Sequence, residues 1–249
     1  MGLSHGPFLR EVIKSVKTIL KSLVFALSVM VLLAAAPPWK SKQIEQWSEQ
    51  DAKLILGNSP WVKKVTPALM PPLNEDQRRQ GGQMGGGEGI GMEAFTPATL
   101  TGVGSSSAAG KRGRRPMHVA TVEIRWESAR AVRAAEEKAH EEDPPALADG
   151  SYVVAIYDVP GVDVNQTALP FQLKKDAFFK VEGKKDRRAS RVDLLPQEGG
   201  FATIVFMFPR SEEITPQDQR ITFLALIGRL SVAQYFYTEE MTIQGKLEL

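Results

Sequence analysis

The sequence predicts a mainly β protein, an antiparallel, immunoglobulin-like β-sandwich with a small N-terminal helical element and one inserted helix. Three observations lead to this expectation. The second half of the chain holds many short apolar runs with strand-like alternation, Pro and Gly separate most of them, and no helices alternate with them. A parallel sheet built from βαβ units needs such helices, so the pattern favours two antiparallel sheets packed together.

The predicted β-sandwich domain covers residues 117–249. In its first strand, 118–126, the residues Ala120, Val122, Ile124 and Trp126 alternate with polar ones. The later strands are expected at 152–157, 177–182, 187–195, 201–208, 220–227, 230–237 and 241–248. Residues 127–142 are strong helix formers that stop at Asp143-Pro144-Pro145, and they form the inserted helix.

The last of these strands carries a specific expectation. From Met241 to Leu249 every second residue is apolar or Gly, and no polar tail follows in the sequence given. An exposed edge strand of this kind would promote aggregation, so we expect the segment to pair in the sheet with its apolar side on the core. Phe206, Phe223 and Phe236 lie in neighbouring predicted strands and are its expected core partners.

Residues 37–66 predict a small helical element, in which the helical sequence pattern begins at residue 39. Ser48 and Asp51 have the spacing of a capping box, and Gly57-Asn58 is a natural end for the helix. Three tryptophans lie close together here, Trp39, Trp47 and Trp61. We interpret them as packing of this element against a larger body, with an aromatic ligand platform as the alternative.

Residues 67–116 have a different composition, rich in Gly and Ser and poor in large apolar side chains. Such a segment cannot bury enough surface to offset the entropy of ordering its backbone, so we expect a disordered linker or a very long loop. Its glycines at 85–89 lack the Lys-Ser/Thr of a phosphate-binding loop. Its basic cluster, 111–115, is interpreted as solvated charge, with contact to an anionic polymer or lipid as the alternative.

Residues 1–36 predict a secretory signal peptide. Residues 22–36 carry no charge and are short for a membrane span, which needs about 20 residues. The expected cleavage lies next to Ala34 or Ala35; the alternatives are an uncleaved membrane anchor and a buried helix. Residues 1–36 carry four basic residues and one acidic residue, so residues 37–249 have a net charge of −1. The basic character of the whole chain therefore gives no argument for nucleic acid as a partner.

The chain contains no cysteine, which excludes disulfides, thiolate metal sites and a cysteine nucleophile. Export without disulfides fits a bacterial envelope, so we expect a periplasmic or extracellular protein, tethered to the inner membrane if the N-terminal segment is uncleaved. In that case the membrane is contacted through this segment alone.

A resemblance supports export. Several short stretches resemble those of uncharacterised exported proteins from acidobacteria-type soil bacteria, and together they span most of the chain outside 1–36 and 67–116: Trp47 to Trp61, Ile124 to Ala129, Phe208-Pro209-Arg210 and Met241 to Leu249. The resemblance implies export and no particular activity. A related-looking class carries a Gly-Trp-x-Thr-Asp motif, which this sequence lacks.

Candidates for chemistry are few. The Ser residues at 105–107 fall in the predicted linker, and His118 and His140 are the only histidines after residue 36, which disfavours a Ser-His hydrolase. Glu137, His140 and Glu141 would share one face of the predicted helix and could ligate a metal. A solvated charged face explains the same residues, and we favour it.

Carboxylates in predicted loops and turns complete the search: the pairs Glu212-Glu213 and Glu239-Glu240, and the single residues Asp158, Asp163 and Asp218. Neighbours on a strand point to opposite faces, so the pairs do not make a facing acid and base. The single aspartates lack the spacing of a calcium-binding loop and suit turns.

The sequence therefore assigns no catalytic, cofactor-binding or metal-ligating residue and leaves open whether the chain is an enzyme. The expected function is an exported, non-enzymatic β-sandwich protein with a binding or envelope-structural role and an unknown protein or cell-envelope partner. The alternatives are a membrane-tethered accessory protein and a hydrolase whose site is formed by residues distant in sequence.

Overall fold

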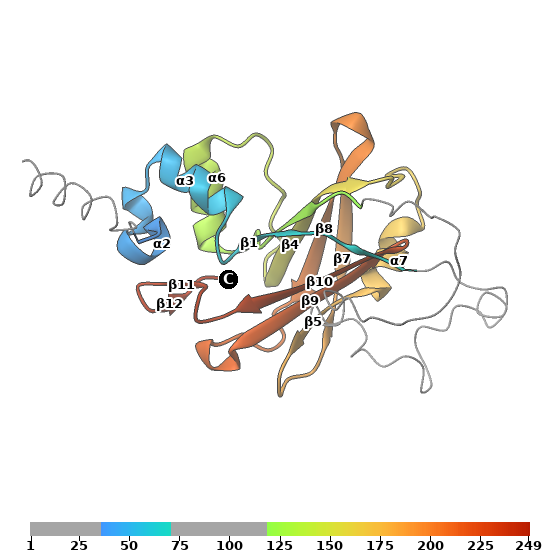
Figure 1. Ribbon diagram of the computed structural model, residues 1–249. Coiled ribbons are helices and arrows are strands. Elements are labelled where there is room, and N and C mark those ends of the chain that lie inside the picture. Colours follow the sequence, from blue (N-terminus) through green and yellow to red (C-terminus); the bar gives the residue numbers. More distant parts are fainter. Residues whose placement is uncertain (1–35, 71–118) are drawn as a thin grey trace, which may run out of the picture. The chain divides into compact units, whose positions relative to one another are not determined.

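Two five-stranded antiparallel sheets lie face to face and carry most of the structure (Figure 1). The computed structural model describes residues 36–70 and 119–249. The first sheet has the order β1 (Val62–Val65), β3 (Val122–Arg125), β4 (Ser151–Pro160), β8 (Phe201–Pro209) and β7 (Arg191–Pro196). The second sheet has the order β2 (Ala68–Leu69), β10 (Leu230–Tyr237), β9 (Arg220–Ile227), β5 (Ala177–Val181) and β6 (Arg187–Arg188). The prediction of a mainly β, antiparallel protein is thus confirmed.

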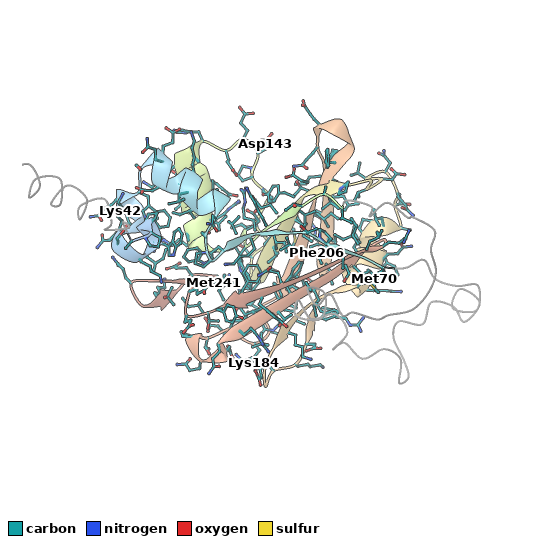
Figure 2. The ribbon with its side chains drawn as sticks, viewed as in Figure 1. Lys42, Met70, Asp143, Lys184, Phe206 and Met241 are labelled. Atoms are coloured by element: carbon teal, nitrogen blue, oxygen red, sulfur yellow. The ribbon has the colours of Figure 1, made fainter. Side chains whose placement is uncertain are left out.

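Aromatic side chains from both sheets meet in the space between them. Phe179 of β5 stacks on Phe208 of β8, with ring centroids 3.9 Å apart, and on the ring of Trp126 at 5.0 Å. Phe223 of β9 contacts Phe206 of β8 in an edge-on arrangement. Phe206 lies near the middle of the molecule (Figure 2). Phe206, Phe223 and Phe236, which the sequence predicted as core partners of the C-terminal segment, are all fully buried.

Three helices gather at one end of the two sheets (Figure 1): α2 (Pro38–Ser41), α3 (Glu49–Gly57) and α6 (Arg130–Ala139). α3 begins as predicted, because the Ser48 hydroxyl accepts a hydrogen bond from the Asp51 amide and Asp51 accepts one from the Ser48 amide. It also ends as predicted, with Asn58 as its C-cap. A further helix, α7 (Leu169–Lys175), follows β4, and single 3-10 turns occur at η1 (Ile44–Gln46), η3 (Glu198–Gly200) and η4 (Pro216–Asp218).

The helical prediction for 39–66 is wrong at its end. Val62–Val65 form β1, which pairs with β3 from Val62↔Arg125 to Val65↔Val122. A β-branched residue at each end of this tetrapeptide favours a strand, and the turn at Pro60-Trp61 separates it from α3. Of the predicted linker, only 67–70 lie among the described residues, and Ala68–Leu69 form β2 there.

The predicted strand 187–195 is in fact two strands that belong to different sheets. The amide of Ala189 still donates to Ala177 of the second sheet, at 3.0 Å, whereas the amide of Ser190 donates to Met207 of the first sheet, at 2.8 Å. The chain therefore crosses from one sheet to the other within two residues. Residues 187–191 contain one apolar side chain, that of Ala189, so no sequence pattern reveals the crossing.

The inserted helix is present between β3 and β4 but is shorter than predicted. It ends at Ala139, because His140 adopts a left-handed conformation with φ of 55° and closes the last turn. Glu141 then leaves the helix, and its carboxylate bonds Arg125 of β3. A tertiary contact thus ends the helix before Asp143-Pro144.

The C-terminal segment does not pair in either large sheet, so that prediction is wrong. It forms its own hairpin from β11 (Thr242–Ile243) and β12 (Lys246–Leu247), with positive φ angles at Gln244 and Gly245 in the turn. Met241 and Ile243 are buried as predicted, whereas Leu247 is only partly buried. The hairpin is fastened by the Trp61 indole, which donates a 2.6 Å hydrogen bond to the Glu248 carbonyl.

No helix among the described residues, 36–70 and 119–249, is both long enough and apolar enough to cross a bilayer.

Candidate functional site

A cluster of charged side chains is buried where α6 meets the outer face of the first sheet. Its centre is Arg125 of β3, whose side chain is 7% exposed. The pairing of Arg125 with Ala155 of β4 places the guanidinium on the face of the sheet that points away from the aromatic core. On the same face a second apolar cluster is formed by Val153, Ala155, Val205 and Met207. The guanidinium therefore lies next to apolar surface and depends on nearby carboxylates for its stability.

Four carboxylates surround Arg125. Nη1 of Arg125 donates to Glu141 Oε2 at 2.5 Å and lies 3.4 Å from Glu136 Oε1, while Nη2 donates to Glu123 Oε1 at 2.8 Å. Nε is 3.9 Å from Glu127 Oε1. The guanidinium also lies 4.5 Å from the centre of the Tyr157 ring. Arg125 thus joins β3 and β4 to α6 and to Glu141, two residues beyond the end of α6.

A second arginine joins the cluster from α6. Nη1 of Arg133 donates to Glu136 Oε2 at 2.6 Å and lies 3.5 Å from Glu127 Oε2. Nη2 of Arg133 donates to the Pro145 carbonyl at 2.8 Å, which holds the segment that leads from α6 back to β4. The two arginines therefore share the Glu127–Glu136 pair of carboxyl groups.

The sequence Trp126-Glu127-Ser128 explains how Glu127 enters this cluster. The Trp126 ring turns into the aromatic core, and its indole donates to the Ser128 hydroxyl at 3.1 Å. The same hydroxyl accepts a hydrogen bond from the Val153 amide, which fixes the turn against β4. Glu127, between these two residues, is directed to the other side and has no exposed surface.

The surroundings of Glu127 favour its protonated form. Burial raises the pKa of Glu127 well above its usual value, and the neighbouring Glu136 carboxyl raises it further, whereas Arg125 and the hydrogen bond from Tyr157 lower it. The guanidinium nitrogens of Arg133 and Arg125 lie 3.5 and 3.9 Å from the oxygens of Glu127, and the Tyr157 hydroxyl donates to Oε1 at 2.7 Å. The other oxygen, Oε2, is buried and has no hydrogen-bond partner among the described residues.

A hollow of about 300 Å³ opens beside the cluster. It is lined by residues of α3, β3 and the end of α6, namely Lys53, Leu56, Gly57, Glu123, Arg125, Ala139 and Glu141. Glu123 and Glu141 therefore each face Arg125 on one side and the hollow on the other. Glu127 and Glu136 do not line the hollow. A ligand there can contact carboxylates that are already fixed by Arg125, but the hollow does not extend to Glu127, the carboxyl group whose pKa is raised.

The residues that the sequence suggested for chemistry are not brought together here. Because α6 ends at Ala139, the side chains of Glu137, His140 and Glu141 do not share one helical face, and Glu141 instead bonds Arg125. Among the described residues no group of three or more His, Asp or Glu is placed to hold a metal ion. His118, the serines at 105–107 and the basic cluster at 111–115 lie outside the described residues.

Carboxylates in the loops stabilise local turns. Asp163 accepts a hydrogen bond from the Asn165 amide, and Asp218 caps η4 through the Thr215 amide while it also pairs with Lys184. Asp158 adopts φ of 58° where the β4–β8 pairing is irregular. Glu212, Glu213, Glu239 and Glu240 are exposed.

The three tryptophans of the N-terminal element pack as interpreted. Trp61 and Trp47 are buried, and the Trp39 ring meets Trp61 edge-on at 6.5 Å.

Sequence reasoning missed the Arg125 cluster because it assigned Glu123 and Arg125 to a polar, solvated strand face. One feature of the sequence does point to this cluster. Glu123, Arg125 and Glu127 alternate in charge at every second position, which places opposite charges side by side on one face. The pattern predicts an ion network only if a helix covers that face.

Comparison with known proteins adds no relative, since no family model, no curated protein and no solved structure matches this chain.

Proposed function

We propose that this chain is an exported, non-enzymatic binding protein built on an immunoglobulin-like β-sandwich, and that the hollow beside Arg125 receives a cationic group of its partner. One observation carries the proposal: Glu127, the carboxyl group whose pKa is raised, is buried behind Arg125 and Tyr157, whereas the carboxylates that face the hollow are fixed by an arginine. General acid catalysis requires the proton donor to reach the substrate. The arrangement therefore favours binding of a partner over acid catalysis.

The charges of the cluster indicate what the hollow would bind. With Glu127 protonated, three carboxylates, Glu123, Glu136 and Glu141, face the two guanidiniums of Arg125 and Arg133. One negative charge remains. Lys53 at the rim does not neutralise it, because its ammonium pairs with Glu49 at 2.6 Å. A single lysine-like or arginine-like group, placed between Glu123 and Glu141, would complete the network.

Site-specific photo-crosslinking in the producing cell tests this. A benzophenone amino acid at position 53, on the exposed rim of the hollow, should give a crosslinked partner, and the adduct should be lost when Glu141→Gln is added. The matched control carries the crosslinker at position 198, an exposed residue in the turn between β7 and β8. Equal adducts at positions 53 and 198, or an adduct that Glu141→Gln leaves unchanged, would count against binding in the hollow.

Export is tested separately. Val29→Asp with Leu32→Asp places two charges in the apolar run 22–36, each of which costs about 2.5–3.5 kcal/mol on the insertion scale. The double variant should stay in the cytoplasm, and N-terminal sequencing of the wild-type product should distinguish cleavage from anchoring. Normal export of the double variant would refute the signal.

A further inference from the structure

Positive charge is concentrated in one stretch of the chain. Residues 174–191 contain eight Lys or Arg and three Asp or Glu, a net charge of +5, whereas residues 37–249 as a whole carry −1. The other residues of 37–249, taken together, therefore carry a net negative charge. An asymmetry of this size is a physical argument about partners, since a local basic surface attracts anionic ones.

Some of these charges are already engaged. Lys184 pairs with Asp218, Arg191 pairs with Asp193, and Arg187 is buried. Four exposed cations remain on α7, β5 and β6, and none of them forms an ion pair with a carboxylate in the described part of the chain: Lys174, Lys175, Lys180 and Arg188. We call these four residues the basic surface.

The backbone brings the four together. Arg188 of β6 is paired with Phe178 of β5, and Lys180 lies two residues further along β5, so Arg188 and Lys180 project from the same face of the second sheet. Arg188 Nη1 also donates to the Lys175 carbonyl at 3.2 Å, which fastens the end of α7 to β6. The basic surface therefore begins at α7 and runs along β5 toward the turn that carries Lys184; α7 and β5 are labelled in Figure 1 and Lys184 in Figure 2.

An apolar side chain stands at the α7 end of this surface. α7 is anchored by Leu173, which is buried, and by Leu169, which packs on the core. Phe171 lies on the opposite side of the helix and is 60% exposed, more than the other exposed large apolar residues in the described part of the chain. The Lys175 ammonium lies 4.3 Å from the centre of its ring. A rigid helix thus presents one phenylalanine surrounded by lysines.

We propose that the basic surface and Phe171 bind the surface of an anionic phospholipid bilayer. The lysines and Arg188 would contact headgroup phosphates, and the Phe171 ring would enter the boundary between headgroups and acyl chains. Phe171 stacks on no other aromatic ring of the described residues, so it offers no flat platform of the kind on which nucleotides or sugars stack. A projecting ring flanked by cations fits a bilayer better than a soluble polyanion.

Flotation with vesicles tests the proposal on the full chain. Vesicles of phosphatidylglycerol and phosphatidylcholine are compared with vesicles of phosphatidylcholine alone. Wild type should bind the anionic vesicles more strongly, and K174Q/K180Q/R188Q should weaken this binding by about five-fold for each charge removed. Phe171→Ser should weaken it by about ten-fold or more, because a phenylalanine side chain no longer leaves water.

The matched control is K40Q/K64Q/K246Q, which changes the net charge equally at exposed positions on other elements. All variants share residues 1–36, so any contribution of that segment to vesicle binding cancels. Equal binding of wild type to both kinds of vesicle overturns the proposal, and so does a control variant that loses as much binding as the surface variant. A third measurement uses soluble polygalacturonate, a polyanion without acyl chains. If wild type shows no preference for anionic vesicles but binds polygalacturonate, and K174Q/K180Q/R188Q abolishes that binding, the basic surface binds a soluble polyanion instead.

Discussion

The phenol of Tyr157 donates a hydrogen bond of 2.7 Å to Oε1 of Glu127, a carboxyl group with no exposed surface. The bond joins β4 to the residues between β3 and α6. Tyr157→Phe keeps the ring beneath Arg125 but leaves Glu127 without this donor, so the free energy of unfolding should fall by about 1–3 kcal/mol. Urea unfolding followed by tryptophan fluorescence measures the change. Tyr237→Phe, at an exposed position, is the control and should change stability by less than about 0.5 kcal/mol.

Glu127→Gln should change how stability depends on pH. Unfolded Glu127 titrates near its ordinary pKa of 4.5, and burial raises its pKa in the folded chain well above that. The contribution of the protonated group is therefore fully present below about pH 4.5 and is lost as the pH rises through the folded pKa. Glutamine cannot ionise, so the variant should become more stable relative to wild type as the pH increases.

Urea midpoints of wild type and Glu127→Gln, compared between about pH 5 and pH 9, measure this difference. Glu137→Gln, an exposed change on the neighbouring helix α6, should follow the wild-type curve at every pH. If the wild-type and Glu127→Gln curves run parallel, Glu127 does not hold a proton.

Phe179 of the second sheet contacts the first sheet, its own neighbouring strand and Trp126. It stacks on Phe208 and on Trp126 and meets Phe223 edge-on. Phe179→Ala should cost about 3–5 kcal/mol, the usual range for truncation of a buried aromatic side chain. Phe171→Ala removes the same atoms from an exposed position and should be close to neutral. Equal unfolding midpoints for the two variants would contradict the assigned core.

The C-terminal hairpin should contribute to stability through its first strand. Met241 is fully buried and Leu247 is only partly buried, so Met241→Ala should cost about 2–5 kcal/mol and Leu247→Ala clearly less. Lys246→Ala, at an exposed position, should cost less than about 0.5 kcal/mol. Thermal unfolding ranks the three variants. A larger loss for Leu247→Ala than for Met241→Ala would indicate that the segment is the core strand expected from its alternation.

The features that could be predicted from the sequence depend on neighbours along the chain. The Ser48–Asp51 cap is fixed by residues three apart, and the burial of Phe206 and Phe223 follows from the continuous apolar runs in which they lie. Val62–Val65 was missed because four residues are too few to show a strand period, and its pairing with β3 is not visible in sequence.

The candidate site could not be predicted for the same reason. Arg125 is buried only because α6 folds back over its face, and its shortest bond is to Glu141, which lies beyond the helix end. Taken alone, alternating Glu and Arg on a strand indicate a solvated face. Whether such residues are solvated or form a closed network is decided by a helix placed through tertiary contacts.

The position of β2 has a consequence for the order in which the protein can fold. Ala68 and Leu69 pair with Ser231 and Leu230, so two early residues of the chain complete the second sheet only when one of its last strands is present. Contacts between such distant segments form late, because a large loop must close before they contribute. A chain synthesised from its N-terminus cannot finish this sheet until β10 has left the ribosome. Completion of the sheet therefore has to wait for the synthesis of every residue between Leu69 and β10.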